Sequence, residues 1–292
     1  MAMDPRPESR DLPTSPIRFD DGAHFRIEIP STESAAYLRE VLAAAAELKV
    51  PVHRASQGSG VFMLTDAEIT DFADVGTAAG VEVCLFARPT SNWDIGAAAH
   101  TETGALFSGA CRGEAGLEAA LRHLRRATDL GIRSALISDL GLLSLVCEQR
   151  RINRLPADLR LKMAASFPVT NGATARVLAS LGADTINVAG DLSLEQYAAM
   201  RAAVSTPFDI YIESPGALGG LVRIWEVAEI VRVAAPVYLK FGIRNSPDLY
   251  PTGTHHAQVS TALARERVRR ARLALDEIQR SGHAFQHTPA RR

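Results

Sequence analysis

The stretch "FDIYIESPGALGG", residues 208–220, decides between two kinds of fold. Its apolar and polar residues alternate, with Phe208, Ile210 and Ile212 set against Asp209, Tyr211 and Glu213. Such alternation usually means that one strand face packs on a core while the other meets water. In a closed parallel barrel both faces are covered, so the two acids and the phenol would point into the barrel interior. The rest of the chain decides which arrangement applies.

Eight β-like runs alternate with longer helix-like segments along the chain. The runs begin at residues 24, 50, 81, 132, 159, 184, 207 and 236. The segments between them repeat apolar residues at helical spacing, as in "ESAAYLREVLAAAAELK" from residue 33. This order predicts a single-domain (β/α)₈ TIM barrel over residues 23–282. An open doubly wound sheet is the alternative, although no GxGxxG follows the first strand.

Composition sets the broad class of the protein. Hydrophobic residues make up 47% of the 292 residues and the formal net charge is -1, so we expect a packed core and no nucleic-acid partner. No run of about 18 apolar residues occurs, so no membrane span is expected. Three scattered cysteines without a CxxC pair predict reduced thiols in a cytoplasmic protein. The sequence leaves open whether the protein forms a homodimer.

Both ends of the chain differ from the middle. Residues 1–22 are rich in proline and charge and lack the apolar stretch of a signal peptide, which predicts a disordered lead-in. Residues 283–292, "HAFQHTPARR", are expected to form a loose tail.

The barrel prediction gives the polar side chains of the strands a common direction. Helices outside a barrel need apolar partners, so the polar residues should point inward. Those expected inside are Glu28, Lys162, Asn187, Asp209, Tyr211, Glu213, Tyr238 and Lys240. A buried ion is costly unless it is paired. The set is therefore either a structural ion network or the lining of a wet site at the C-terminal ends of the strands, where barrel active sites lie.

Four of these residues are the candidates for catalysis: Glu213, Lys240, Lys162 and Asn187. Glu213 lies nearest the catalytic end and is expected to act as a general base or metal ligand. Carboxylates of Glu213 and Glu28 beside Lys240 would favour its charged form, which suits stabilisation of developing negative charge. Lys162 has no obvious acid beside it and is the better amine for an imine.

Candidate substrate contacts lie in the strands and in the loops that follow them. They are Glu28, Arg54, Gln57, Arg88, Asp139, Arg244 and His255. Glu213 and His255 together would suit a divalent cation, which leaves a metal cofactor open.

Two loops each have two interpretations. Residues 53–60, "HRASQGSG", suit backbone contact with a polar ligand, or form a simple tight turn. Residues 88–116 form either a surface insertion or a lid over the site, with Trp93 and His100 as its candidate contacts.

Three segments together resemble the peptidase U32 family, barrel proteins described as collagenase-like peptidases. They are "ISDLGLLSLVCE", "LKMAASFPVTNGATARVLASLGADTINVAGDLSLEQYAAM" and "FDIYIESPGALGG", within residues 132–220. The resemblance implies a barrel and a hydrolase acting on peptides or a related amide. It places Asn171, Asn187, Asp191 and Glu213 in the matched motifs.

The chain also departs from the family pattern. The histidine-glycine and the cysteine-containing run usual after this strand are replaced by "ESPGALGG". Related members hold an iron–sulfur cluster with four cysteines, whereas this chain has three scattered ones, so no cluster is expected.

Three functions follow as hypotheses. The leading one is a U32-like hydrolase that acts on a small anionic or peptide-like substrate by acid/base chemistry. The first alternative is a lyase or aldolase that uses an imine on Lys162 or a divalent metal at Glu213. The second is a non-catalytic accessory or binding protein on a barrel scaffold.

Overall fold

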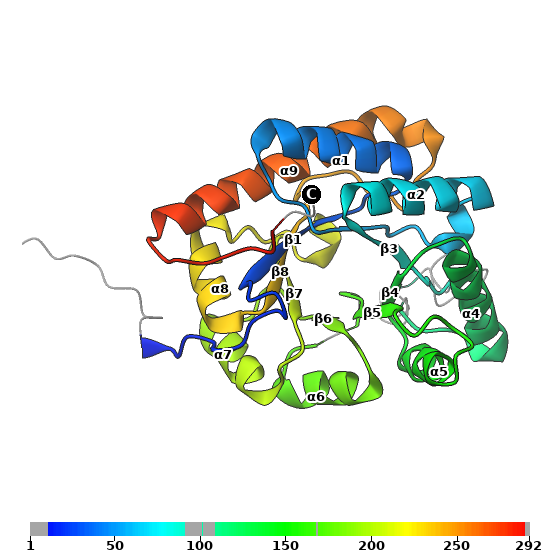
Figure 1. Ribbon diagram of the computed structural model, residues 1–292, viewed down its shortest axis with the longest axis horizontal. Helices are drawn as coiled ribbons and strands as arrows, with labels where there is room; N and C mark the ends of the chain where they lie inside the picture. The colour runs from blue at the N-terminus through cyan, green and yellow to red at the C-terminus, as the bar shows by residue number, and fades with distance from the viewer. Residues whose placement is uncertain (1–10, 91–100, 102–108, 168, 290–292) are drawn as a thin grey trace, which may run out of the picture.

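A closed parallel barrel forms the centre of the molecule. The structure is a computed structural model and describes residues 11–90, 101, 109–167 and 169–289. Its strands neighbour one another in chain order and β8 pairs with β1, which confirms the predicted TIM barrel (Figure 1). The strands are β1 (Phe25–Pro30), β2 (Arg54–Ser56), β3 (Glu82–Phe86), β4 (Ser134–Ile137), β5 (Arg160–Met163), β6 (Thr185–Asn187), β7 (Phe208–Glu213) and β8 (Val237–Phe241).

Helices surround the barrel, as Figure 1 shows. They are α1 (Ala35–Leu48), α2 (Asp66–Ala79), α4 (Gly113–Asp129), α5 (Leu140–Arg151), α6 (Gly172–Leu181), α7 (Leu194–Ala203), α8 (Val227–Ala234) and α9 (Ala257–Arg280). Short 3₁₀ turns lie at η2 (Val61–Met63), η4 (Gly216–Leu218), η5 (Ile224–Glu226) and η6 (Thr254–His256). Two helices begin with reciprocal capping boxes, formed by Thr65 with Glu68 and by Ser193 with Gln196, which satisfy their free N–H groups.

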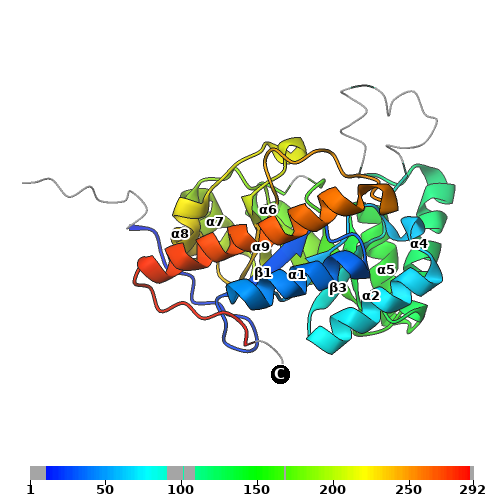
Figure 2. The ribbon, with the colours of Figure 1, turned by 90° about the horizontal axis from the view of Figure 1, so that it is seen from above.

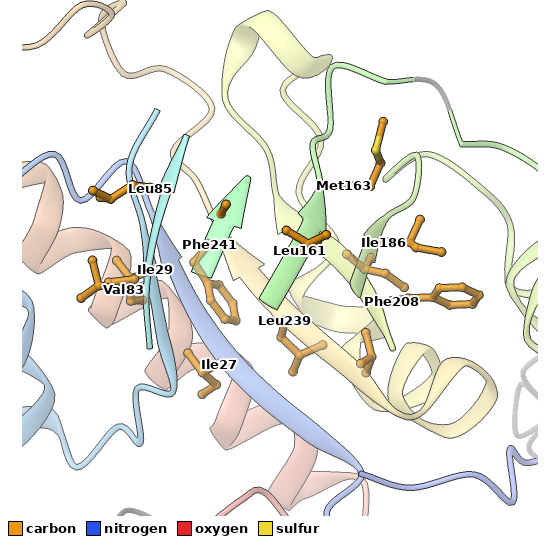
Figure 3. Packing of buried hydrophobic residues seen from close by; sticks show 14 of the residues in the cluster. Ile27, Ile29, Val83, Leu85, Leu161, Met163, Ile186, Phe208, Leu239 and Phe241 are labelled. Carbon is orange, nitrogen blue, oxygen red and sulfur yellow. The ribbon is translucent and has the colours of Figure 1, made fainter. Parts of the chain in front are cut away.

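The apolar core lies between the strands and the surrounding helices. Figure 3 shows the outward-facing strand residues that build it, among them Ile27, Ile29, Val83, Leu85, Leu161, Met163, Ile186, Phe208, Leu239 and Phe241. They form one cluster with apolar residues of the surrounding helices, which confirms the outward direction that alternation predicted for the apolar residues of β1, β5, β6 and β8 and for Phe208 of β7. Within the described part of the chain, no helix is both long enough and apolar enough to cross a membrane.

A β-bulge interrupts the alternation of β7. Tyr211 pairs with Lys240 and Glu213 pairs with Phe241, so Ile212 is one residue too many for the regular ladder. After the bulge, Glu213 takes the side of the sheet on which Phe241 lies, facing the helices. The prediction that Glu213 points into the barrel is therefore wrong.

Both chain ends pack across the N-terminal end of the barrel. The Ser15 hydroxyl donates to the carbonyl of Ala235 at 2.5 Å, and the buried Phe19 ring meets Tyr238 edge-on at 5.4 Å. On the other side, His24 N–H donates to the carbonyl of Gln286 at 2.8 Å. The predictions of a disordered lead-in and a loose tail are wrong for residues 11–22 and 283–289. Figure 2 shows the C-terminal segment on the lower side of the barrel, opposite the loops that follow β7 and β8.

Candidate active site

Six ionic side chains from six strands meet inside the barrel. This interior charge network consists of Glu28, Arg54, Glu82, Lys162, Asp209 and Lys240. Three are anionic and three cationic, so the formal charges balance. Its members are buried apart from the partly exposed Glu82, so the structural interpretation considered above applies to most of the set.

Glu28 is the centre of the network. One carboxylate oxygen accepts a hydrogen bond from the Ser56 hydroxyl at 2.6 Å and lies 3.8 Å from Lys240 Nζ. The other oxygen pairs with Lys162 and lies 3.3 Å from Arg54. Burial alone would raise the pKa of Glu28, but the three neighbouring cations hold it well below its usual range. Glu28 is therefore an anion that interacts with three cations, and it is not free to bind a substrate.

Asp209 is the second buried acid. Its Oδ1 lies 2.8 Å from Arg54 and 3.4 Å from Lys162. Its Oδ2 is buried without a hydrogen-bond partner among the described residues. Burial raises the pKa of Asp209, and the charge of Glu28 adds to this, whereas Lys162 and Arg54 lower it. A proton taken up by this pair of acids therefore goes to Asp209 rather than to Glu28.

Arg54 and Glu82 lie at the N-terminal end of the interior. Each is the first residue of its strand, and Arg54 Nε donates to Glu82 at 2.7 Å. The Arg54 guanidinium lies 3.7 Å from the centre of the Tyr238 ring. Arg54 is 1% exposed. The expectation that Arg54 contacts substrate at the rim is therefore wrong, because Arg54 fills the barrel floor.

Lys240, Asn187 and Tyr211 occupy the opposite end of the interior, and we refer to them as the mouth cluster. Lys240 Nζ donates to Asn187 Oδ1 at 2.5 Å and lies 4.1 Å from the centre of the Tyr211 ring. The Asn187 amide donates to the carbonyl of Met163 at 2.5 Å, which fixes its oxygen toward Lys240. Burial raises the pKa of the Tyr211 hydroxyl, so that group keeps its proton. Sequence reasoning placed all three inside, and the structure brings them together.

Lys162 does not have the surroundings expected of it. It is 1% exposed and pairs with both Glu28 and Asp209. The expectation that no acid lies beside Lys162 is wrong, because carboxylates from β1 and β7 reach across the barrel. Alternation along one strand does not reveal such contacts.

Side chains of the protein itself hold the turn after β2 by hydrogen bonds to its backbone. Gln57 exchanges two hydrogen bonds of 3.0 Å with the backbone of Gly60. The backbone N–H groups of Gly58 and Ser59 donate to the buried Glu33 carboxylate at 2.8 and 2.9 Å. Of the two interpretations for residues 53–60, the tight turn is confirmed, since Glu33 already occupies the N–H groups that a ligand would use.

A second buried cluster near this turn escaped sequence reasoning. The Tyr250 ring packs against Gly58, and its hydroxyl lies 2.5 Å from that of Ser31. Arg267 donates to the Ser31 carbonyl at 3.3 Å. Burial raises the pKa of Glu33 and lowers that of Arg267. Tyr250 and Arg267 come from the loop after β8 and from α9, so no spacing in the sequence connects them to β2.

The remaining candidate contacts serve local roles or lie on the surface. Asp139 caps α5, accepting from Leu142 N–H at 2.8 Å, and its other oxygen accepts from Cys111 N–H at 2.9 Å. Arg88 donates to the carbonyl of Gly58 at 2.8 Å. Arg244 and His255 are exposed, and neither contacts Lys240. Trp93 and His100 lie outside the described residues.

Glu213 is engaged on the outer side of the barrel. One oxygen accepts from Arg244 N–H at 3.0 Å, and the other lies 3.2 Å from Arg270 Nε of α9. His255 instead lies against His256, with ring centres 4.1 Å apart and ring planes tilted by 46°. The described residues include no group of three or more His, Cys, Asp or Glu side chains suited to a metal ion. Glu213 and His255 therefore do not fit the proposed cation pair.

The fold and the interior define a (β/α)₈ barrel protein with a polar cluster toward the C-terminal ends of its strands. Residues 102–217 match the model of Peptidase family U32, which confirms the resemblance that the sequence motifs carry. No curated protein matches the chain.

Solved structures with a similar fold include proteins of several activities. One is a U32 peptidase, with 19% identity, 68% of this chain and 73% of that chain covered, and a TM-score of 0.42. Another is 2,3-dimethylmalate lyase, with 12% identity, coverage of 90% and 86%, and a TM-score of 0.46. A truncated 3-deoxy-D-arabino-heptulosonate 7-phosphate synthase from Thermotoga maritima has 12% identity, coverage of 96% and 97%, and a TM-score of 0.48. These likenesses are too distant to transfer an activity.

Proposed function

We propose that the protein is an enzyme that hydrolyses a small anionic or peptide-like substrate at the mouth cluster. Lys240 and Tyr211 supply the positive charge and the hydroxyl donor in this proposal, and Asn187 positions Lys240. The family match of residues 102–217 favours a hydrolase. A cytoplasmic location and a homodimer stay predictions.

The environment of Lys240 carries this proposal. The ammonium is almost buried and has three donors, but only one described hydrogen-bond acceptor, the neutral oxygen of Asn187. The one carboxylate near Lys240, that of Glu28, is 3.8 Å away and is shared with two other cations. Because a buried cation is costly without anionic partners, the free donors of Lys240 favour an anionic group in the mouth.

The same geometry suggests how Lys240 would assist the reaction. Hydrolysis of an amide or ester builds negative charge on the carbonyl oxygen. A fixed ammonium in a water-poor site stabilises that charge more strongly than water does. Tyr211 retains its proton and can donate a second hydrogen bond to the same oxygen.

The contacts of Lys162 weigh against the imine alternative. An imine requires a neutral, accessible amine, whereas Lys162 is buried and paired with two carboxylates. The chain has only three lysines, Lys49, Lys162 and Lys240, so borohydride trapping with carbonyl compounds followed by peptide mapping gives an unambiguous answer. An adduct on Lys162 would restore the lyase hypothesis.

Mutation of Lys240 tests the hydrolase proposal. Substrates are found by mass spectrometry of peptide and acyl-amide mixtures incubated with the protein. Lys240→Met should lower kcat/KM by roughly 100-fold or more, the usual effect of removing an oxyanion donor. Lys49→Met, at an exposed position outside the barrel, is the matched control and should leave kcat/KM unchanged. Full activity of the folded Lys240→Met protein would contradict the proposal, and ligand binding without turnover in the wild type would favour the accessory role.

A further inference from the structure

A pocket of about 670 Å³ opens at the N-terminal end of the barrel, away from the mouth cluster. It lies among the starts of several strands and is bordered by Thr288 and Pro289 of the C-terminal segment. Its polar lining includes Arg26, His53, Glu82, Arg133, Arg160 and Tyr238. A pocket of this size can hold a small organic molecule.

Two guanidinium groups at the pocket have donors to spare. Arg160 makes one contact with a described residue, to Glu82 at 3.3 Å, and Arg160 is about half exposed. Arg133 uses Nη1 for the carbonyls of Thr128 and Ile132, while its Nε lies 3.5 Å from Asp158. The backbone N–H of Arg160 donates to the backbone carbonyl of Arg133 at 2.9 Å, so the two residues are neighbours on adjoining chain segments. Their free N–H groups suit a carboxylate or a phosphate.

A buried hydroxyl adds an independent indication of a ligand. Tyr238 is 1% exposed and lines the pocket, and its oxygen accepts a hydrogen bond from Arg26 at 3.0 Å. No described acceptor takes the proton of this hydroxyl, although buried O–H groups normally have one. Burial raises the pKa of Tyr238, which keeps that proton in place. A ligand oxygen would provide the missing acceptor.

The acids of the pocket leave room for an anion. Glu82 is already engaged by Arg54, Ser134 and Arg160, and its pKa is lowered, because these partners outweigh the effect of burial. Asp158 is 73% exposed, so water screens its attraction for Arg133. Asp21 is bound to Arg26. The charges of Arg133 and Arg160 are thus the ones that remain accessible.

We propose that this pocket is a second ligand site, distinct from the mouth, for a small molecule with a carboxylate or phosphate group and a further acceptor oxygen. The anionic group pairs with Arg160, Arg133 adds positive charge at the border of the pocket, and the acceptor oxygen takes the proton of Tyr238. The proposal does not depend on the proposed hydrolase activity. Because Glu82 contacts both Arg160 and Arg54, the ligand would also touch one end of the interior charge network.

Calorimetric titration of the full chain with inorganic phosphate and, separately, with succinate tests the site. We expect saturable binding of at least one probe in the millimolar range or tighter, and the stronger probe identifies the anionic group. Arg160→Gln should weaken binding at least tenfold, and Tyr238→Phe should weaken the binding of succinate, which carries a second acceptor group. Arg125→Gln, an exposed arginine of α4, is the matched control and should not change the affinity.

The variant Lys240→Met separates the two sites. Probe binding that survives Lys240→Met but is lost in Arg160→Gln belongs to the N-terminal pocket. Loss of binding in Lys240→Met alone, or the absence of saturable binding of both probes, overturns the proposal. Circular dichroism of each variant establishes that it is folded before it is titrated.

Discussion

Glu213 fastens helix α9 to the barrel. Glu213 is 2% exposed. Its carboxylate faces Arg270 of α9 and accepts a hydrogen bond from the backbone N–H of Arg244, in the loop after β8. A buried carboxylate with a charged and a backbone partner stabilises the elements that bring those partners together. The role of Glu213 is therefore to hold α9 and the β8 loop in place.

Glu213→Gln should lower the free energy of unfolding by roughly 1–2 kcal/mol while leaving the activity of the folded protein intact. Urea denaturation measures the first quantity. Glu266→Gln is the control, because Glu266 pairs with the same Arg270 Nε at 3.1 Å but its side chain is 33% exposed, so it should change stability little. A loss of turnover without a loss of stability would return Glu213 to the catalytic residues.

His53 makes the stability of the protein depend on pH. Its Nδ1 accepts the N–H of Ile27 at 2.9 Å and its Nε2 lies 2.8 Å from the Thr288 carbonyl, so the neutral ring carries its proton on Nε2. Burial is the main cause that lowers the pKa of His53 to about 4. In the unfolded chain the pKa is about 6.5. Between these values only the unfolded state takes up the proton, so stability is full above pH 6.5 and falls as the pH drops toward 4.

We expect this loss to reach about 3 kcal/mol near pH 4, measured as the midpoint of urea unfolding at a series of pH values. His53→Gln should flatten the profile over this range, whereas His255→Gln, at an exposed position, should leave it as it is in the wild type. An unchanged profile in His53→Gln would contradict the assignment.

At this scale, sequence patterns predicted some side chains and missed others for physical reasons. Alternation placed Glu28, Lys162, Asn187 and Lys240 inside, and their mutual contacts confirm it. Alternation failed for Glu213. The bulge at Ile212 turns the Glu213 side chain to the opposite face of the sheet, although polar and apolar residues continue to alternate in the sequence.

At the start of helix α5, the sequence predicted the position of Asp139 correctly but its role incorrectly. Asp139 follows β4 at the end of the barrel where substrates bind, which made it a candidate contact. Its two oxygens instead cap the helix and hold the backbone of Cys111. Aspartate is a common N-cap, so position at a strand end does not separate the two roles.

Asp139→Ala should lower the free energy of unfolding by about 1–2 kcal/mol, because a helix cap and a second hydrogen bond are lost. Asp139→Asn keeps an acceptor oxygen and should cost less, with normal turnover. Asn171→Ala, which removes only the cap of α6 through Thr174 N–H, is the comparison and should have a smaller effect than Asp139→Ala. Thermal unfolding of the three variants provides the measurement, and inactive but stable Asp139→Asn protein would support a substrate contact.

The whole molecule is organised around the interior charge network. Lys162 neutralises Glu28 and Asp209 at the middle of the barrel. Lys162→Met would leave these acids with fewer cations and should destabilise the fold by roughly 3–5 kcal/mol. Chemical denaturation compares it with Lys49→Met, which should behave like the wild type. Wild-type stability of Lys162→Met would show that the network contributes nothing net.

The barrel itself was predictable because its signal is spread over the chain. Eight alternating strand and helix units each contribute, and an error in one of them leaves the order intact. The site depends on contacts such as Lys162 with Glu28 and Arg270 with Glu213, which join residues far apart in the sequence. Composition misassigned residues 11–22 and 283–289 for the same reason, since proline and charge do not reveal that Phe19 packs on Tyr238.

The docking of both chain ends at one face has a practical consequence. The Leu12 carbonyl accepts from Arg232 at the end of α8, and His53 Nε2 lies 2.8 Å from the Thr288 carbonyl at the start of the barrel. A fluorophore, an affinity handle or a bead attached within residues 11–14 or 287–289 would therefore sit on the side away from Lys240. Protein immobilised at these positions would present the end of the barrel that carries the mouth cluster to the solution, ready for single-molecule or flow-cell measurements.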